Sequence, residues 1–127
     1  MPKPKLNSIL GLDDFTDRSS VLKLALAVAA EFLGTLLLVF VGCGTALNLS
    51  TPTNLVQISL GFGLVVFAVV HVVGDVSGGH VNPAVTCGLL VSGRIGAARA
   101  ALYVLAQCVG GIGEFIVDTL TLTRNVD

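Results

Sequence analysis

Two long stretches without charge constrain the fold of this chain more than any other feature. Residues 55–74 contain no Asp, Glu, Lys or Arg, and residues 24–47 contain only Glu31. A helix needs about 20 mostly apolar residues to cross the roughly 30 Å hydrocarbon layer of a bilayer. Charged residues make up only 12% of the 127, about half the share of an ordinary soluble domain. The sequence therefore predicts an all-α integral membrane protein with spans at about 24–47 and 55–74.

Polar or interrupted segments flank these two stretches. Residues 1–22 are predicted to form a tail that is mobile apart from a short amphipathic turn near Val21. The first apolar stretch is too long for the core of a signal peptide, so we expect an uncleaved span. A third span is expected at about 97–117, although Glu114 and Asp118 interrupt the apolar sequence there. A carboxylate at the bilayer centre costs about 2.5–3.5 kcal/mol, so both are expected near the far interface.

Lys and Arg side chains predict the orientation in the membrane. None occurs in the linker 48–54, whereas several precede the first span or follow the second, namely Lys3, Lys5, Arg18, Lys23, Arg94 and Arg99. Short loops rich in Lys and Arg stay on the cytoplasmic side. We therefore expect the N-terminus and residues 75–98 in the cytoplasm and the linker on the opposite side. The net charge of −1, without a basic block, gives no indication of nucleic-acid binding.

The sequence "SGGHVNPAVTCGLLVSG" (77–93) holds an apolar run too short to cross a bilayer. Asn is a preferred N-cap and Pro is favoured at the first helical position. A helix from Asn82 to about Val91 would be roughly 15 Å long, half the hydrocarbon thickness. The glycine-rich residues before it are predicted to be extended. Residues 75–93 thus form either a re-entrant segment with a half-helix or an ordinary cytoplasmic loop with an Asn-Pro turn.

The re-entrant interpretation carries a functional consequence. Non-helical backbone at membrane depth is tolerated only where it is buried in protein or lines a watery cavity. The carbonyls of residues 78–81 could then form a ladder of hydrogen-bond acceptors, and Asn82 could cap the helix while its amide NH₂ donates into the cavity. The helix N-terminus adds about half a positive charge. Such an end disfavours cations and protons and lets neutral, hydrogen-bonding solutes pass.

Three motifs carry a family resemblance: "AEFLGT" (30–35), "SLGFG" (59–63) and "SGGHVNPAVT" (77–86). They resemble the aquaporin, or major intrinsic protein, family. The motif sequences are most similar to those of its water-selective, insect-like animal members. The resemblance implies half of a six-helix inverted-repeat fold, with three transmembrane helices and a re-entrant half-helix. It implies a first repeat at residues 23–113, whereas residues 114–127 diverge from the family.

The resemblance also implies roles for individual residues. It makes Asn82, Pro83 and Ala84 the first of two pore-lining NPA motifs. It implies that the backbone carbonyls of Gly78, Gly79, His80 and Val81 form the carbonyl ladder. Glu31 matches a buried glutamate that braces this loop through hydrogen bonds, and Phe62 matches the aromatic position of the outer selectivity constriction.

The function that the resemblance implies is a water channel, open to water and small neutral solutes and present here as a truncated half. No second NPA motif follows residue 84, and the Arg and His that the family places in the constriction have no counterpart. The alternative is a non-conducting truncated isoform that binds full-length subunits and modulates their assembly or trafficking. Expected partners are the lipid bilayer and further subunits, in a homo-oligomer or with full-length aquaporins. The plasma membrane is the expected location.

The remaining residues receive structural interpretations. No enzyme activity or cofactor is expected, and no metal, because His71, His80 and Cys87 lack the spacing of a metal site. His71 is expected to be a packing histidine with its polar atoms satisfied. The three cysteines are expected to be buried thiols. The glycines of the apolar segments are expected to allow close helix crossings.

Overall fold

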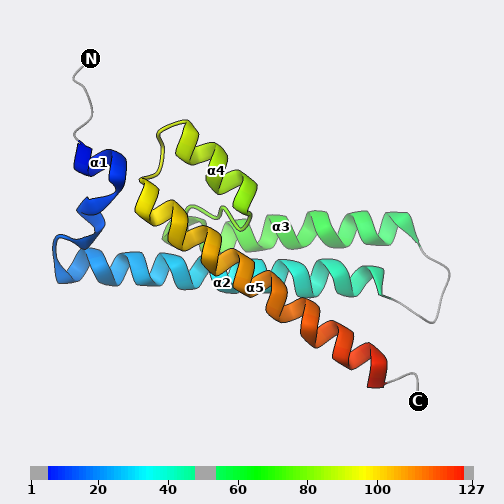
Figure 1. Cartoon of the computed structure of the whole chain (residues 1–127). Helices are drawn as coiled ribbons and strands as arrows, with labels where there is room; N and C mark the ends of the chain where they lie inside the picture. The colour runs from blue at the N-terminus through cyan, green and yellow to red at the C-terminus, as the bar shows by residue number, and fades with distance from the viewer. Residues whose placement is uncertain (1–5, 48–53, 125–127) are drawn as a thin grey trace.

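The computed structural model describes residues 6–47 and 54–124, which are helical apart from short connections. The elements are α1 (Leu6–Leu10), the 3₁₀ turn η1 (Leu12–Phe15), α2 (Arg18–Ala46), α3 (Leu55–Ser77), α4 (Pro83–Val91) and α5 (Ala97–Arg124) (Figure 1). No strand occurs in the described residues. The all-α fold class is therefore confirmed, and the arrangement fits one partial aquaporin-type repeat.

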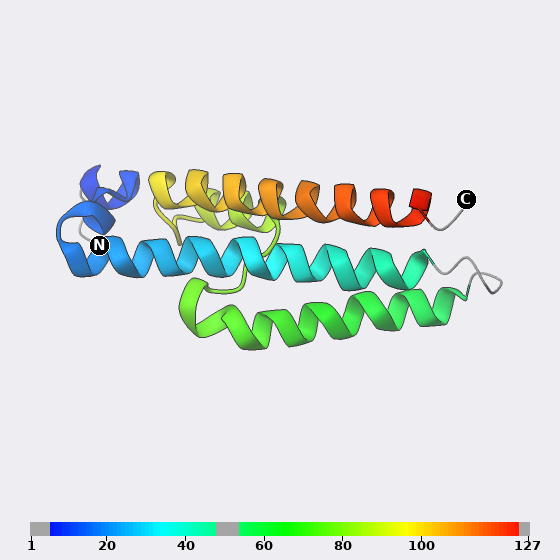
Figure 2. The same cartoon turned by 90° about the horizontal axis from the view of Figure 1, so that it is seen from below.

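Helix α2 is the centre of the fold. It lies between α3 on one side and α5 on the other, while short α4 lies beside the first half of α5 (Figures 1 and 2). Glycines allow the close approach on both sides. A Cβ at Gly110 of α5 would lie 2.6 Å from the carbonyl oxygen of Phe32. A Cβ at Gly34 would lie 2.6 Å from Cγ1 of Val81, in the loop before α4.

Helices α2 and α3 are long and apolar enough to cross a membrane, and in the described residues no other helix is. Their large apolar side chains mostly face outward; Leu64 and Phe67 of α3, for example, are 64% and 71% exposed. A helix of a soluble core would bury such side chains. The apolar part of α5 is shorter, Ala97–Gly113, but the helix continues to Arg124, beyond the limit of 117 expected for the third span.

The ends of the helices differ from the predicted ends for local reasons. Helix α2 begins at Arg18, well before residue 24, because the Asp17 side chain accepts a hydrogen bond from the Ser20 N–H and caps the first turn. Helix α3 continues to Ser77 and ends where Gly78 adopts a left-handed conformation, with φ of 93°. The expectation of a mobile tail is wrong for residues 6–22, which are folded. Most of the linker, residues 48–53, lies outside the described residues.

Some of the structural interpretations are corrected. His71 packs by stacking on the ring of Phe67, as expected, but it is exposed and its ring makes no hydrogen bond to another described residue. Cys87 and Cys108 are exposed on α4 and α5, and Cys43 is partly buried. The glycine expectation holds where a close neighbour exists, at Gly34, Gly42, Gly61 and Gly110, but Gly44 and Gly63 have no neighbour within 4 Å.

Candidate functional site

The N-terminal tip of α4 is built by Asn82. Its backbone is extended, with φ of −159° and ψ of 125°, and its Oδ1 atom accepts a 2.8 Å hydrogen bond from the N–H of Ala84. Pro83 occupies the first helical position, where its missing N–H leaves no donor unpaired. The Asn82 side chain is exposed, and no described residue accepts a hydrogen bond from its amide NH₂. The cap therefore uses the oxygen and leaves two donors at the helix tip.

The loop before this tip has an unusual backbone. Gly78 and Gly79 have positive φ angles of 93° and 64°, and so does Val81, with 40°. A positive φ is strained for a β-branched residue, at a cost on the order of 1–3 kcal/mol. No described residue donates a hydrogen bond to the carbonyls of residues 78–81. Within residues 6–47 and 54–124, these carbonyls are acceptors without an internal partner.

The carboxylate of Glu31 accepts hydrogen bonds from this strained backbone. Glu31 lies in α2 and has 0% exposed surface. Its Oε1 accepts hydrogen bonds from the His80 N–H at 2.9 Å and the Ser77 hydroxyl at 2.6 Å. Its Oε2 accepts from the Val81 N–H at 2.6 Å and from Nε2 of Gln107 at 2.7 Å. A buried carboxylate with four donors is well compensated, so it can fix the loop without being left unpaired.

Helices α4 and α5 complete the network. The Tyr103 hydroxyl donates to the carbonyl of Ser77 at 2.9 Å. Nε2 of Gln107 also donates to Oγ1 of Thr86 at 2.9 Å, and that Oγ1 lies 3.1 Å from Nδ1 of His80. The His80 ring meets the Tyr103 ring edge-on, with centroids 5.2 Å apart. We call these residues the Glu31 cluster: Glu31, Ser77, His80, Val81, Thr86, Tyr103 and Gln107.

Four members of the Glu31 cluster were missed by reasoning from the sequence: Ser77, Thr86, Tyr103 and Gln107. All four are buried. A signal was present for two of them, because Tyr103 and Gln107 are polar, lie four residues apart in an uncharged stretch and therefore share one face of a helix. Polar side chains at that spacing in a span indicate a buried partner, which here is Glu31.

Phe62 lies apart from the other predicted site residues. It is on α3, about 22 Å from Ser77 along the helix at 1.5 Å per residue. The residue is 36% exposed, and its ring packs over Gly42 of α2. The structure thus brings together the residues 78–81, the tip of α4 and Glu31, and it leaves Phe62 towards the other end of the bundle.

Comparison with known proteins gives consistent matches. The family model described as "Major intrinsic protein" matches residues 18–125. Human Aquaporin-1 is 47% identical over 94 residues, which cover 68% of this chain and 35% of the relative. Sheep Aquaporin-5 is 51% identical over 87 residues, covering 68% and 33%. Rat Aquaporin-2 is 47% identical over 97 residues, covering 75% and 36%. The matches span about a third of the length of these relatives.

Proposed function

This chain belongs to the major intrinsic protein family, and we propose that it forms part of a membrane channel for water and small neutral solutes. The observation that carries the proposal is the tip of α4, where the Asn82 amide donors and the four carbonyls of the preceding loop have no partner among the described residues. Donors and acceptors alternating along one path can replace the hydrogen bonds that a water molecule leaves in bulk solvent. The three relatives named above all carry the name aquaporin.

The proposed selectivity follows from the same geometry. The N-terminus of α4 carries a partial positive charge, and the Asn82 donors add to the positive potential there. A cation or proton would be repelled, whereas a neutral solute can accept from Asn82 and donate to the carbonyls. In this proposal Glu31 braces the loop, and Phe62 contributes to a separate, outer constriction that restricts solute size.

The site is open on one side in this chain. The side chains of Asn82, Ala84 and Val85 are exposed at the tip of α4. We propose that a complementary pore wall covers them, either in a longer chain, in a second copy or in a full-length aquaporin subunit. The same uncovered face supports the second candidate function, in which the chain binds full-length subunits and modulates their assembly or trafficking. We propose that the N-terminus faces the cytoplasm, which the distribution of Lys and Arg supports, and that the protein resides in the plasma membrane.

Osmotic flux in proteoliposomes tests the proposal. The chain alone is expected to give no osmotic flux above the lipid background, since no complementary pore wall covers the exposed tip of α4. The chain reconstituted with the remaining part of a relative is expected to give flux well above background. Asn82→Asp should abolish that flux, because it keeps the oxygen that caps Ala84 and replaces the donors with a charge.

Matched outcomes separate the alternatives. Asn82→Gln serves as a control that keeps the amide but moves it by one methylene. Flux that is unchanged in Asn82→Asp would contradict the pore-lining assignment. Robust flux from the chain alone would instead indicate a pore made of two copies. A chain that never conducts, yet lowers the surface level or flux of a co-expressed full-length relative, would support the modulating function.

A further inference from the structure

The N-terminal segment, residues 6–15, folds back onto the bundle where α5 begins (Figures 1 and 2). Gly11 is buried and has a φ of 73°. A Cβ at this position would lie 3.1 Å from Cα of Gly96, immediately before α5. A larger residue would clash with backbone and would be strained. The segment is therefore docked tightly against the start of α5.

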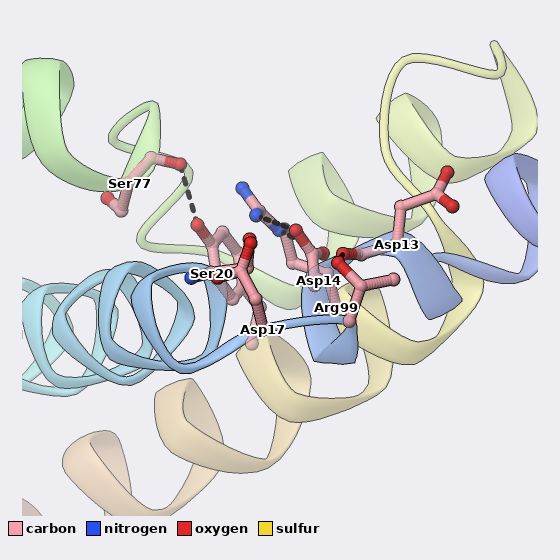
Figure 3. A network of polar contacts seen from close by, with 8 residues as sticks. Asp13, Asp14, Asp17, Ser20, Ser77 and Arg99 are labelled. Atoms are coloured by element: carbon pink, nitrogen blue, oxygen red, sulfur yellow. Dashed lines mark hydrogen bonds and ion pairs between the residues drawn. The ribbon is translucent and has the colours of Figure 1, made fainter.

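An ion pair fixes the same contact. Nε of Arg99 donates a 2.8 Å hydrogen bond to Oδ2 of Asp14, and a second guanidinium nitrogen binds the other carboxylate oxygen (Figure 3). Both side chains are largely shielded, with 31% and 23% exposed. The two-pronged geometry is the strong form of an Arg–carboxylate pair. Among the nearby carboxylates, Asp17 is used as the cap of α2.

The length of α2 places this segment relative to the bilayer. Helix α2 has 29 residues and is about 43 Å long at 1.5 Å per residue. A bilayer with its headgroup regions is about 40–45 Å thick, so a helix of this length that runs along the bilayer normal would have Arg18, its first residue, at headgroup level. Phe15 precedes Arg18 by three residues, and Arg99 is the third residue of α5. The docked segment therefore lies at the edge of the membrane.

The outer face of the segment is apolar. Leu6, Ile9 and Leu10 share one face of α1, because positions i, i+3 and i+4 of a helix are neighbours. Leu6 is 68% exposed and Phe15 is 49% exposed, and Ile9, Leu10 and Leu12 are exposed as well. Arg18 and Lys23, in the first turns of α2 that follow the segment, are exposed basic residues, and Asp13 within the segment is an exposed acidic one. A cluster of large apolar side chains with basic neighbours at headgroup level is typical of an interfacial membrane anchor.

We propose that residues 6–15 are an interfacial anchor whose apolar face inserts into the headgroup boundary of the bilayer. Gly11 and Asp14 tie the anchor to the first turn of α5, the helix that also carries Tyr103 and Gln107 of the Glu31 cluster. The anchor thus fixes the depth of α5 in the membrane. This proposal rests on membrane insertion and not on water conduction, so it is tested without measuring flux.

Tryptophan fluorescence tests the anchor, because the chain contains no Trp. The variant Phe15→Trp, in the full chain in liposomes, is expected to be quenched more by lipids brominated near the headgroup than by lipids brominated near the chain end. The control Leu33→Trp, on the exposed face at the middle of α2, should show the opposite order. Quenching of Phe15→Trp by aqueous iodide alone would overturn the proposal. Protection from both iodide and bromine would also overturn it, since protein would then cover the face.

A second variant tests the tie to α5. Asp14→Asn in the Phe15→Trp background is expected to raise the iodide quenching constant of the introduced tryptophan several-fold, because the ion pair with Arg99 is lost. Arg99→Gln should raise it to a similar extent, and the two changes together should add little. Asp13→Asn is the matched control, since Asp13 is exposed and points away from Arg99 (Figure 3). Equal quenching in Asp14→Asn and Asp13→Asn would overturn the tie.

Discussion

The middle of the bundle and its linker end are held together by different means. In the Glu31 cluster, hydrogen bonds from α3, α5 and the loop converge on one buried carboxylate of α2. Towards the linker, Phe62 packs over Gly42 and Thr45 packs against Gly61, with no hydrogen bond between α2 and α3 there in the described residues. Apolar packing only brings two helices together, whereas the polar network also imposes a particular backbone shape. Under the proposed function, that shape presents residues 78–82 to the solute.

The largest expected effect comes from removing the centre of the network. Glu31→Ala should leave four donors unpaired in a buried site and lower the free energy of unfolding by about 3–5 kcal/mol. Glu31→Gln keeps one acceptor oxygen and should cost about half as much. Denaturant titration in detergent micelles, followed by circular dichroism, measures both. A loss below about 1 kcal/mol for Glu31→Ala would show that the network contributes little.

Equivalent glycine substitutions on α2 compare the two regions directly. A Cβ at Gly34 would lie 2.6 Å from Val81, which is buried and held by Glu31, so Gly34→Ala should cost about 1–3 kcal/mol. A Cβ at Gly42 would lie 2.5 Å from the Phe62 ring, but that ring is partly exposed and can turn outward. Gly42→Ala should therefore cost less than about 1 kcal/mol. Gly44→Ala, with open space around it, is the control; equal costs at Gly34 and Gly42 would contradict the comparison.

Tyr103→Phe tests a single peripheral bond of the network. It removes the hydroxyl that donates to the carbonyl of Ser77 and keeps the ring that meets His80. The expected cost is about 1 kcal/mol, the net value of one hydrogen bond, and the same micelle titration measures it. A cost near that of Glu31→Ala would place the centre of the network at Tyr103 instead.

The smallest expected effect lies outside both regions, at Asp17. Hydrogen bonds from the Ser20 N–H and the Ser19 side chain lower the pKa of Asp17 below its ordinary value of 3.8. Because the folded-state pKa is depressed, its stabilisation is fully present above pH 3.8 and is lost as the pH falls through the lower folded value. Asp17→Asn keeps the cap and should flatten this dependence slightly, measured as helix content against pH. A steeper acid transition in the variant would be inconsistent with the assignment.

The sequence allowed the helices to be predicted better than the site. Charge-free stretches reveal spans at once, because the bilayer imposes length and polarity on each helix. Asn82 and Pro83 could be recognised because helix capping is a local property. The Glu31 cluster could be predicted only in part, since its partners are up to 76 residues apart in the chain. The sequence also does not indicate which neighbouring helix a polar residue in a span faces. The docking of residues 6–15 includes the Asp14–Arg99 pair, which is also long-range, and could not be predicted from local pattern.

Amide hydrogen exchange at Val81 tests the central claim most directly. We expect the Val81 N–H, bonded to Oε2 of Glu31 at 2.6 Å, to exchange slowly in the intact chain in micelles. In Glu31→Gln the exchange at Val81 and His80 should be at least about tenfold faster, which corresponds to about 1.4 kcal/mol of lost protection. Amides of α3 far from the loop should be unaffected. Unchanged exchange at Val81 in Glu31→Gln would contradict the claim that Glu31 holds the loop that presents Asn82.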